Sequence, residues 1–383
     1  MEMLPGGRDL RFDTLRGLLL VCMTVNHLPT ELRVATDQSL GVFSAAEGFV
    51  FVSGLIAGWV YTRRYRKFGA EGLWSASAKR AMLIYKWHIA SFLGAFVCVQ
   101  MTEHVSGFCA TSAPRLFFEH PLAALGLGAS LLYQPGLLDL LPMYCAFVLL
   151  MPFVIRALES GRRWLVLGAS GTAWLLVQFA PPIDGAPIYP INTGSFNLFA
   201  WQFMFVAGLA IGQARQSGLP QVSRPSRWTV LVAAATVVYG FGLCQFGWPR
   251  PWPDRVFGIL VNKPALGLLR MGDFACLAYL VAIVGERFPW ALTARPLALL
   301  GRHSLVVVSV QSVAVMMLLQ FTSLFETPLS RTLTAAAAIA MLFAAAAAAE
   351  GLPAVRSLFA PVAIGTRQAA GGRIIGPDDA RAA

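Results

Sequence analysis

Ten apolar segments, each long enough to cross a lipid bilayer as a helix, limit what this chain can fold into. They lie at 12–28, 42–62, 80–101, 138–157, 162–180, 195–213, 228–247, 265–286, 301–321 and 331–350. A helix of about 20 apolar residues spans the hydrocarbon core. Only 13% of the 383 residues are charged, whereas soluble domains average about 25%. The sequence therefore predicts an all-α, polytopic membrane protein.

An eleventh apolar segment, 121–133, is shorter than the others and contains Gly126 and Gly128. Its length of about 13 residues is more typical of a re-entrant or interfacial segment than of a span. We therefore expect one short helix there, beside ten transmembrane helices. Residues 1–350 are predicted to form one membrane domain, and residues 351–383, rich in Gly, Ala and Arg, a mobile cytoplasmic tail.

The distribution of lysine and arginine orients this predicted bundle. The chain has 30 Lys and Arg residues, of which Lys86 and Arg270 lie within spans. With the N-terminus inside, most of the remaining 28 lie in cytoplasmic regions. The predicted periplasmic regions contain only Arg33, Arg115, Arg250, Arg255, Lys263 and Arg331. The positive-inside rule then places both termini in the cytoplasm and explains the net charge of +11 without nucleic acid. A full crossing by 121–133 would flip every later loop and largely remove the bias.

Processing signals and metal motifs add little to this picture. No small-residue cleavage site follows the first apolar run, so we expect the first span to be retained. The six cysteines form no CxxC pair, which indicates neither a disulfide framework nor a zinc site. No Walker loop, GxSxG elbow or HExxH motif is present.

The first span carries two ionisable residues, Arg16 and His27. They are eleven residues apart, close to three helical turns, so they share a helix face with a rise of about 16 Å between them. Ionisable groups inside a membrane are costly and suggest function. His27 is either a general base, because imidazole titrates near neutral pH, or an interfacial histidine at a helix end. Arg16 is either functional, a positive-inside anchor, or a local partner of Asp13.

Glu47 lies one to two turns into the second span, at a depth comparable with that of His27. A carboxylate there can orient and stabilise a histidine base, or it can be a buried acid that is hydrogen-bonded to its neighbours. Arg270 and Asp273 are three residues apart on a later span. We predict that these two residues form a structural ion pair.

Cations at the start of the third span form a second candidate group. Lys79 and Arg80 lie at its cytoplasmic entrance, with Lys86 deeper, and Arg302 occupies a similar place at the start of the ninth span. Such cations can bind phosphates or a carboxylate, or can anchor the helix and snorkel. Asp139, at the start of the fourth span, is a further polar residue within an apolar segment.

The segments RDLRFDTLRGLLLVCMTVNH and LGVFSAAEGFVFVSGLIAG resemble the start of the OpgC family, the osmoregulated periplasmic glucan succinyltransferases. LLDLLPMYCAFVLLMP, WQFMFVAGLAIG and LGRHSLVVVSVQS resemble its later landmarks. The family belongs to the membrane acyltransferase-3 superfamily, whose first helix pairs an arginine with a histidine at this spacing. The resemblance implies a bacterial inner-membrane enzyme that moves an acyl group, such as succinyl, from cytoplasmic acyl-CoA to a hydroxyl of a periplasmic glucan.

The resemblance also implies residue roles. His27 would remove the hydroxyl proton, and Glu47 would hold or stabilise the imidazolium. Arg16 and Arg80 would bind donor phosphates or stabilise charge from the cytoplasmic side. The acyl-CoA donor, which is a substrate rather than a bound cofactor, would contact Arg80, Lys79, Lys86 and Arg302. The superfamily's Arg-x-x-Arg begins at Arg80 but has Leu83 in second place, and Gln311 stands where a histidine is common.

Two other classes of protein compete with an enzyme. A secondary transporter or flippase would also place charges in the membrane, but transporters often show inverted repeats, which this sequence lacks. A structural membrane scaffold would have little reason to retain His27, Glu47 and Arg270 in hydrocarbon.

Overall fold

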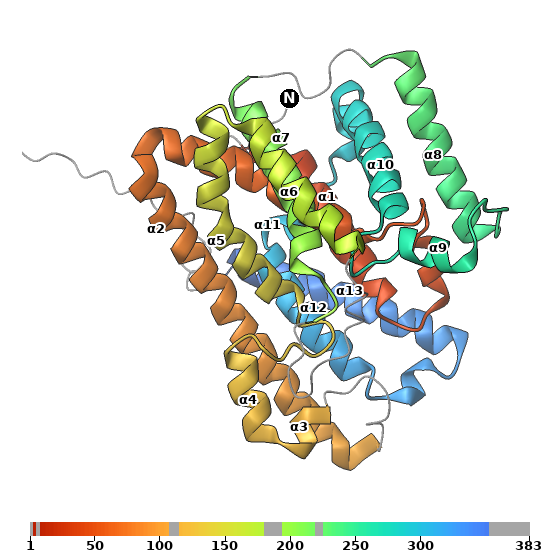
Figure 1. The fold of residues 1–383 in the computed structure, drawn as a ribbon. Helices are drawn as coiled ribbons and strands as arrows, with labels where there is room; N and C mark the ends of the chain where they lie inside the picture. Colours follow the sequence, from red (N-terminus) through yellow and green to blue (C-terminus); the bar gives the residue numbers. More distant parts are fainter. Residues whose placement is uncertain (1–2, 5–7, 107–114, 180–193, 219–224, 352–383) are drawn as a thin grey trace, which may run out of the picture.

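The computed structural model describes residues 3–4, 8–106, 115–179, 194–218 and 225–351, and most of them are helical (Figure 1). The helices are α1 (Leu10–Asn26), α2 (Ala45–Ser106), α3 (Arg115–Glu119), α4 (Pro121–Ala129), α5 (Leu140–Glu159), α6 (Arg163–Phe179), α7 (Leu198–Gln216), α8 (Arg227–Gln245), α9 (Asp254–Leu260), α10 (Leu268–Arg287), α11 (Arg295–Arg302), α12 (Ser304–Leu318) and α13 (Pro328–Gly351). Three short 3-10 turns cover Glu31–Ala35, Pro289–Leu292 and Thr322–Phe325. The strands β1 (Met3–Leu4) and β2 (Arg8–Asp9) form one antiparallel pair. The all-α prediction is confirmed apart from this pair.

Most predicted spans coincide with one helix each to within several residues, and α4 occupies the short segment predicted at 121–133. The exceptions are 42–62 and 80–101, which both fall on α2, and 301–321, which is divided between α11 and α12. Within the described residues, five helices are long and apolar enough to cross a membrane, namely α2, α5, α8, α10 and α13. A sixth is added if α11 and α12 together make one span. The chain is thus a helical membrane protein, and the count of ten spans stays a prediction. The predicted tail lies, after Gly351, outside the described residues.

Helix α2 differs from the sequence-based expectation of two spans joined by a loop. The helix continues through residues 63–79 and breaks only at Gly69, whose φ of 66° and ψ of −166° are non-helical. Residues 63–79 are charged, with five Arg or Lys residues, three Ala and one Glu, and they contain no proline. These are good helix formers, which is why the segment extends both arms of α2 instead of forming a loop. The two arms diverge from this break in Figure 1.

The predicted span at 301–321 is also not one straight helix. Helices α11 and α12 meet at His303 with a bend of 84°. Helix α11 begins with Pro296 in its first turn, a position that suits proline because no intrahelical N–H bond is lost there. The bend brings the start of α12 beside α1, where Arg16 donates a hydrogen bond to the Ser304 hydroxyl.

Helices α2 and α7 pack through two matched pairs of glycines. Gly54 and Gly58 on α2 face Gly208 and Gly212 on α7, and a Cβ at any of the four would overlap backbone of the opposite helix. Each pair has the spacing Gly-x-x-x-Gly, which places both glycines on one helix face. Small residues at such positions let membrane helices approach until their backbones touch. This contact fixes α7 against the first arm of α2.

Helices α1 and α11 also pack through glycines that contact the backbone of the opposite helix. A Cβ at Gly17 would overlap the Leu297 carbonyl, and a Cβ at Gly301 would overlap the carbonyl of Asp13. The two helices therefore cross with direct backbone contact. This crossing holds Arg16, one residue before Gly17, next to the bend at His303.

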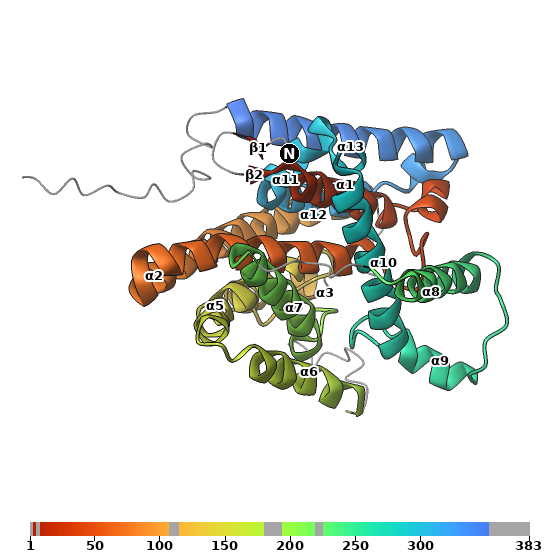
Figure 2. The ribbon, with the colours of Figure 1, turned by 90° about the horizontal axis from the view of Figure 1, so that it is seen from above.

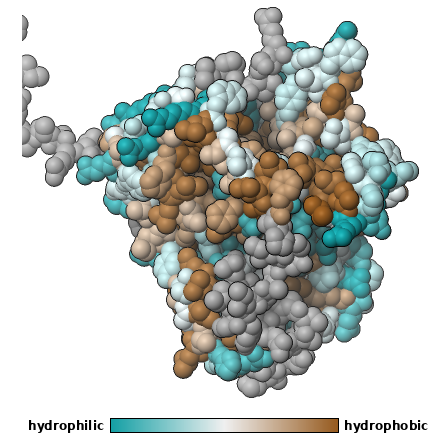
Figure 3. Space-filling view, in the orientation of Figure 1, coloured by the Kyte–Doolittle hydropathy of each residue, from teal (hydrophilic) through white to brown (hydrophobic). Residues whose placement is uncertain are grey.

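The helices form layers when the molecule is seen from above (Figure 2). Helix α13 lies along one edge, followed by α1 with α11 and α12, then α2, then α7 and α5, with α6 outermost. Helices α8, α9 and α10 stand to one side. Large apolar side chains point outward from the outer helices, including Trp164, Leu165, Leu176 and Phe179 on α6 and Trp228, Leu231, Val232 and Val238 on α8. Apolar side chains form a broad patch across the middle of the face in Figure 3, as suits contact with lipid.

Candidate functional site

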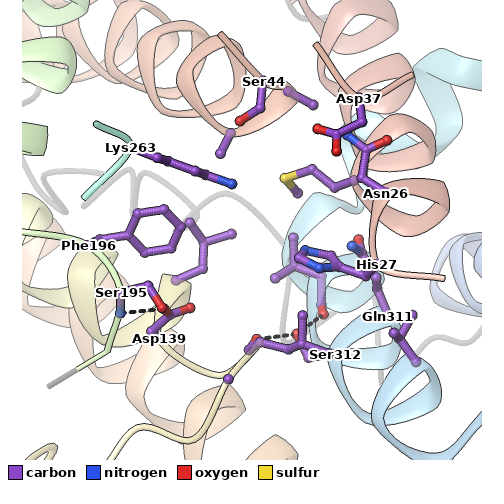
Figure 4. Close-up of a pocket in the computed structure, with 18 of the residues that line it drawn as sticks. Asn26, His27, Asp37, Ser44, Asp139, Ser195, Phe196, Lys263, Gln311 and Ser312 are labelled. Atoms are coloured by element: carbon purple, nitrogen blue, oxygen red, sulfur yellow. Dashed lines mark hydrogen bonds between the residues drawn. The ribbon is translucent and has the colours of Figure 1, made fainter. Parts of the chain in front are cut away.

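A cavity of about 430 Å³ with several polar lining residues opens between α1, α2, α5 and α12, at the end of the bundle where α1 ends and α2, α5 and α7 begin (Figure 4). Its polar lining includes His27, Asp37, Ser44, Asp139, Lys263 and Gln311. Met23, Phe196 and Val308 contribute apolar surface. A small number of converging polar groups in a partly apolar cavity is typical of a ligand site.

His27 is the candidate site residue that lines this cavity. It caps the C-terminal end of α1, and its side chain is exposed. Within the described residues, its imidazole has no hydrogen-bond partner, so the ring nitrogens are open to a ligand. In Figure 4 the ring lies on the same side of the cavity as Asn26, Gln311 and Asp37. A neutral imidazole in this position can accept a proton from a bound hydroxyl group.

Glu47 lies behind the cavity wall and is fully buried. One carboxylate oxygen pairs with the Arg270 guanidinium of α10. The other accepts hydrogen bonds from the Ser44 backbone N–H (3.0 Å) and the Ser44 hydroxyl (2.7 Å). Glu47 therefore bonds to Arg270 and Ser44, and among the described contacts none joins it to His27. It reaches the cavity only through Ser44.

The predicted ion pair between Arg270 and Asp273 on α10 is wrong, because each of the two residues has another partner. Arg270 forms its ion pair with Glu47, and Asp273 instead accepts a hydrogen bond from the backbone N–H of Val42 (2.7 Å). The carboxylate occupies a space that a Cβ at Gly41 or at Gly240 would fill. Arg270 thus holds the first turn of α2 and Asp273 holds the segment before it, which fixes the rim of the cavity.

Lys263 lines the cavity from a loop that is held by α6 and α7. The indole N–H of Trp201 donates to the carbonyls of Lys263 (3.2 Å) and Pro264 (3.1 Å). Trp174 donates to the Leu266 carbonyl (2.8 Å), and Gln178 donates to the Ala265 carbonyl (2.7 Å). The loop is therefore rigidly placed. The ammonium group of Lys263 extends toward the middle of the cavity in Figure 4.

Asp139 stands opposite His27 in the cavity. Its carboxylate accepts a hydrogen bond from the backbone N–H of Ser195 (2.9 Å), and it is 6% exposed. This bond ties the segment before α7 to the start of α5. Asp139 and Lys263 place opposite charges on one side of the cavity, across from His27 (Figure 4).

Backbone strain is concentrated in the loops around this cavity. In the described part of the chain, the non-glycine residues with positive φ are Gln38 (52°), Leu131 (63°), Leu137 (74°) and Leu266 (51°). Such angles are uncommon for bulky side chains. All four residues lie in the loops 27–44, 130–139 and 261–267, which supply cavity residues. Strained backbone of this kind gathers at functional sites, which marks this end of the bundle as the candidate site.

The predicted donor-binding cations lie outside the cavity. Arg16 is half-buried on α1 and lies over the ring of Phe49 at 5.5 Å. Arg80 is half-buried on α2, whereas Lys79 and Lys86 are exposed on the same helix. Their side chains are not among those that line the cavity.

Arg302 lies at the bend between α11 and α12. It pairs with Glu350 of α13 at 3.2 Å, and the imidazole of His303 contacts the same carboxylate at 2.5 Å. This contact joins the end of α11 to the end of α13. The structure therefore places Arg302 in an ion pair and away from the cavity.

A charged cluster occupies the opposite end of α1. Asp9 accepts from the guanidinium groups of Arg11 (2.7 Å) and Arg215 (2.8 Å). Arg215 also lies over the rings of Phe12 (4.9 Å) and Trp59 (4.8 Å). Burial alone would raise the pKa of Asp9, but the hydrogen bonds from Arg11 and the charges of both arginines lower it below its ordinary value. The cluster keeps the N-terminus of α1 on α7.

Sequence reasoning missed three cavity residues, Lys263, Ser195 and Asp37. Asp37 and Lys263 lie in the loops 29–41 and 248–264 between predicted spans, where a charge is unremarkable. Asp139 was visible as a polar residue at the start of a predicted span. The useful signal for the others was the loops' common position at the outer end of the predicted spans, because loops at one end of a bundle can meet in space.

The fold and the cavity define a helical membrane protein with a polar site at one end of the bundle. The family model described as OpgC protein matches residues 8–353, nearly the whole chain. The chain therefore belongs to the OpgC family, and this membership implies a transferase that modifies glucans. No curated protein and no solved structure gave a match.

Proposed function

We propose that this protein is a membrane O-acyltransferase that moves an acyl group from acyl-CoA to a hydroxyl of a periplasmic glucan. One observation carries the proposal: the imidazole of His27 is open to a polar cavity and has no protein partner among the described residues. Family membership supports a glucan as the acceptor. The resemblance of the first two segments supports acyl-CoA as the donor and succinyl as the acyl group.

His27 is the proposed general base. As the hydroxyl oxygen attacks the thioester carbonyl, the imidazole takes the hydroxyl proton, and the carbonyl oxygen carries the negative charge of the tetrahedral intermediate. The intermediate then collapses, the carbon–sulfur bond breaks, and the coenzyme A thiolate leaves with the proton from His27. Cations near the reacting carbonyl stabilise the oxyanion.

Glu47 has a positioning role in this proposal. It bonds to Ser44 and Arg270, so it holds the segment before α2 that forms one side of the cavity. Loss of its charge leaves Arg270 buried without its partner. Its effect on the rate is therefore expected through the shape of the cavity, while His27 acts on the substrate.

Arg16 and Arg80 are the proposed contacts for the donor. Both are half-buried cations on helices that lead away from the cavity, and cations bind phosphate through charge-assisted hydrogen bonds. The alternative anchoring role applies to Lys79 and Lys86, whose side chains are exposed. Arg302 has a protein partner in Glu350, so a donor phosphate there would compete with that carboxylate.

The proposed setting is the bacterial inner membrane, with ten spans and both termini in the cytoplasm. The charge bias of the sequence supports this orientation. The acceptor cavity then faces the periplasm, and the end of the bundle with Asp9, Arg11 and Arg215 faces the cytoplasm. A donor that enters from the cytoplasm and an acceptor that enters from the periplasm would then meet along α1.

A secondary transporter or flippase is the second candidate, because the 84° bend at His303 resembles the broken helices of transporters. Mass spectrometry of periplasmic glycans from cells with and without the protein separates the two functions. An acyltransferase adds the mass of an acyl group to the glycan and identifies that group. Unchanged glycan masses, with a changed distribution of glycan across the membrane, would support the transporter instead.

A further inference from the structure

We propose that Gln311 forms a subsite that binds a second sugar hydroxyl, next to the hydroxyl that reacts at His27. The proposal rests on the proposed function for the identity of the acceptor as a carbohydrate. Gln311 is neither the proposed base nor one of the proposed donor contacts, and the proposal gives it a role in acceptor specificity. The ligand class follows from the chemistry of the cavity wall.

One face of α12 forms part of that wall. Val308, Gln311, Ser312 and Val315 all line the cavity. Their spacing of three, four and seven residues places them on a single helix face. In Figure 4, Gln311 and Ser312 lie on the same side of the cavity as His27.

The Ser312 hydroxyl is already hydrogen-bonded within the protein. Its hydroxyl contacts the carbonyls of Leu137 (2.8 Å) and Val308 (3.0 Å). This contact holds the strained loop at Leu137 against α12. Ser312 therefore shapes the wall and does not offer a free donor to a ligand.

Gln311 is different from the other polar groups of the wall. Its amide oxygen is buried and has no hydrogen-bond partner among the described residues, and the residue is only 5% exposed. Gln202 and Gln213 have satisfied oxygens, because Gln202 accepts from Ser170 at 2.6 Å and Gln213 accepts from Arg163 at 2.9 Å. The oxygen of Gln178 is also buried and unpaired, but Gln178 does not line the cavity. Among the side chains of the cavity that the structure describes, the Gln311 oxygen is the buried acceptor still lacking a donor.

An unpaired buried acceptor selects the ligand that can supply a hydrogen. Buried polar atoms in native proteins nearly always have a partner, and an exception calls for a water or a ligand. A sugar hydroxyl supplies an O–H donor, whereas the carboxylate of a succinyl group and the carbonyl of a thioester are acceptors. A hydroxyl-rich ligand therefore satisfies the Gln311 oxygen, and a succinyl thioester group does not. The position beside His27 makes this hydroxyl a neighbour of the reacting one.

The test is binding of methyl glucoside and its four monodeoxy analogues to the purified full-length protein, measured by NMR titration without acyl donor. For the wild type, one analogue is expected to bind about five- to tenfold more weakly than the parent sugar, because one neutral hydrogen bond is lost. In Gln311→Met, which keeps the length of the side chain but removes the acceptor, that analogue and the parent are expected to bind equally.

Two further variants make the result specific. Gln311→Glu retains an acceptor and is expected to retain the discrimination. Gln320→Met is the matched control, because Gln320 is equally buried (6% exposed), bonds to the Met316 carbonyl and does not line the cavity. It is expected to discriminate like the wild type.

The proposal is overturned if Gln311→Met discriminates as the wild type does, or if no glucoside binds the wild type at millimolar concentration. The assay contains no donor, so it is independent of the transfer reaction. Retained discrimination together with an absence of acyl transfer would refute the proposed reaction and leave the sugar subsite standing.

Discussion

The buried ion pair between Glu47 and Arg270 gives the sharpest prediction about stability. Their side chains are 0% and 3% exposed, so removing one partner leaves a charge in a low-dielectric interior. Such a change typically costs about 3–5 kcal/mol. We expect Glu47→Gln and Arg270→Met each to lower the free energy of unfolding by an amount in this range. A loss of about 3 kcal/mol is roughly a 150-fold change in the ratio of folded to unfolded protein.

The double variant separates this electrostatic effect from simple loss of contacts. With both charges removed, no buried charge is left unpaired, so we expect Glu47→Gln/Arg270→Met to be clearly more stable than either single variant. The assay is unfolding of the detergent-purified protein by titration with SDS, followed by helix content. Additive losses in the double variant would refute the reasoning.

An exposed pair of an arginine and a carboxylate is the control for this cycle. Arg33 and Asp37 pair at 2.9 Å, and their side chains are 47% and 36% exposed. Water screens such a pair, and its contribution is about 0–1 kcal/mol. We therefore expect Arg33→Met to have a much smaller effect than Arg270→Met. Equal losses at the two sites would show that burial does not control the cost.

Three further outcomes are expected. Gly301→Ala should lower the yield of folded protein in size-exclusion chromatography, because the added Cβ overlaps the Asp13 carbonyl, and normal yield would show that α1 and α11 separate easily. Arg80→Ala should weaken binding of acyl-CoA in calorimetry more than binding of sugar, and equal donor affinity would confine Arg80 to anchoring. Reporter fusions after Arg163 should read cytoplasmic and those near Trp252 periplasmic, and a periplasmic signal after Arg163 would contradict ten spans.

Much of the fold could be predicted because apolar runs mark helices directly. The predicted ranges 138–157 and 331–350 became α5 and α13 with small shifts at their ends. Residues 63–79 were misjudged as a loop because their charge outweighed their helix propensity in the prediction. The bend at His303 was also not predicted, because the contact beside it, between Arg16 and Ser304, joins residues 288 apart in the chain.

The candidate site was predicted in part. His27 was found from its position at the end of an apolar helix, and it lines the cavity. The partner of Glu47 could not be found, because Arg270 is 223 residues away in the chain, whereas spacing arguments detect only neighbours three or four residues apart. The nearby pair of Arg270 with Asp273 was therefore preferred, although Asp273 bonds to the backbone of Val42.

The most direct test of the proposed mechanism is the rate of acyl transfer by His27→Ala in reconstituted vesicles, with acyl-CoA on one side and glucan on the other. Loss of a general base typically lowers a rate about 10²–10⁴-fold, and we expect a loss in that range with normal folding and insertion. His120→Ala is the matched control, because His120 is exposed and does not line the cavity. A well-folded His27→Ala variant that acylates glucan at the wild-type rate would contradict the assignment of His27 as the base.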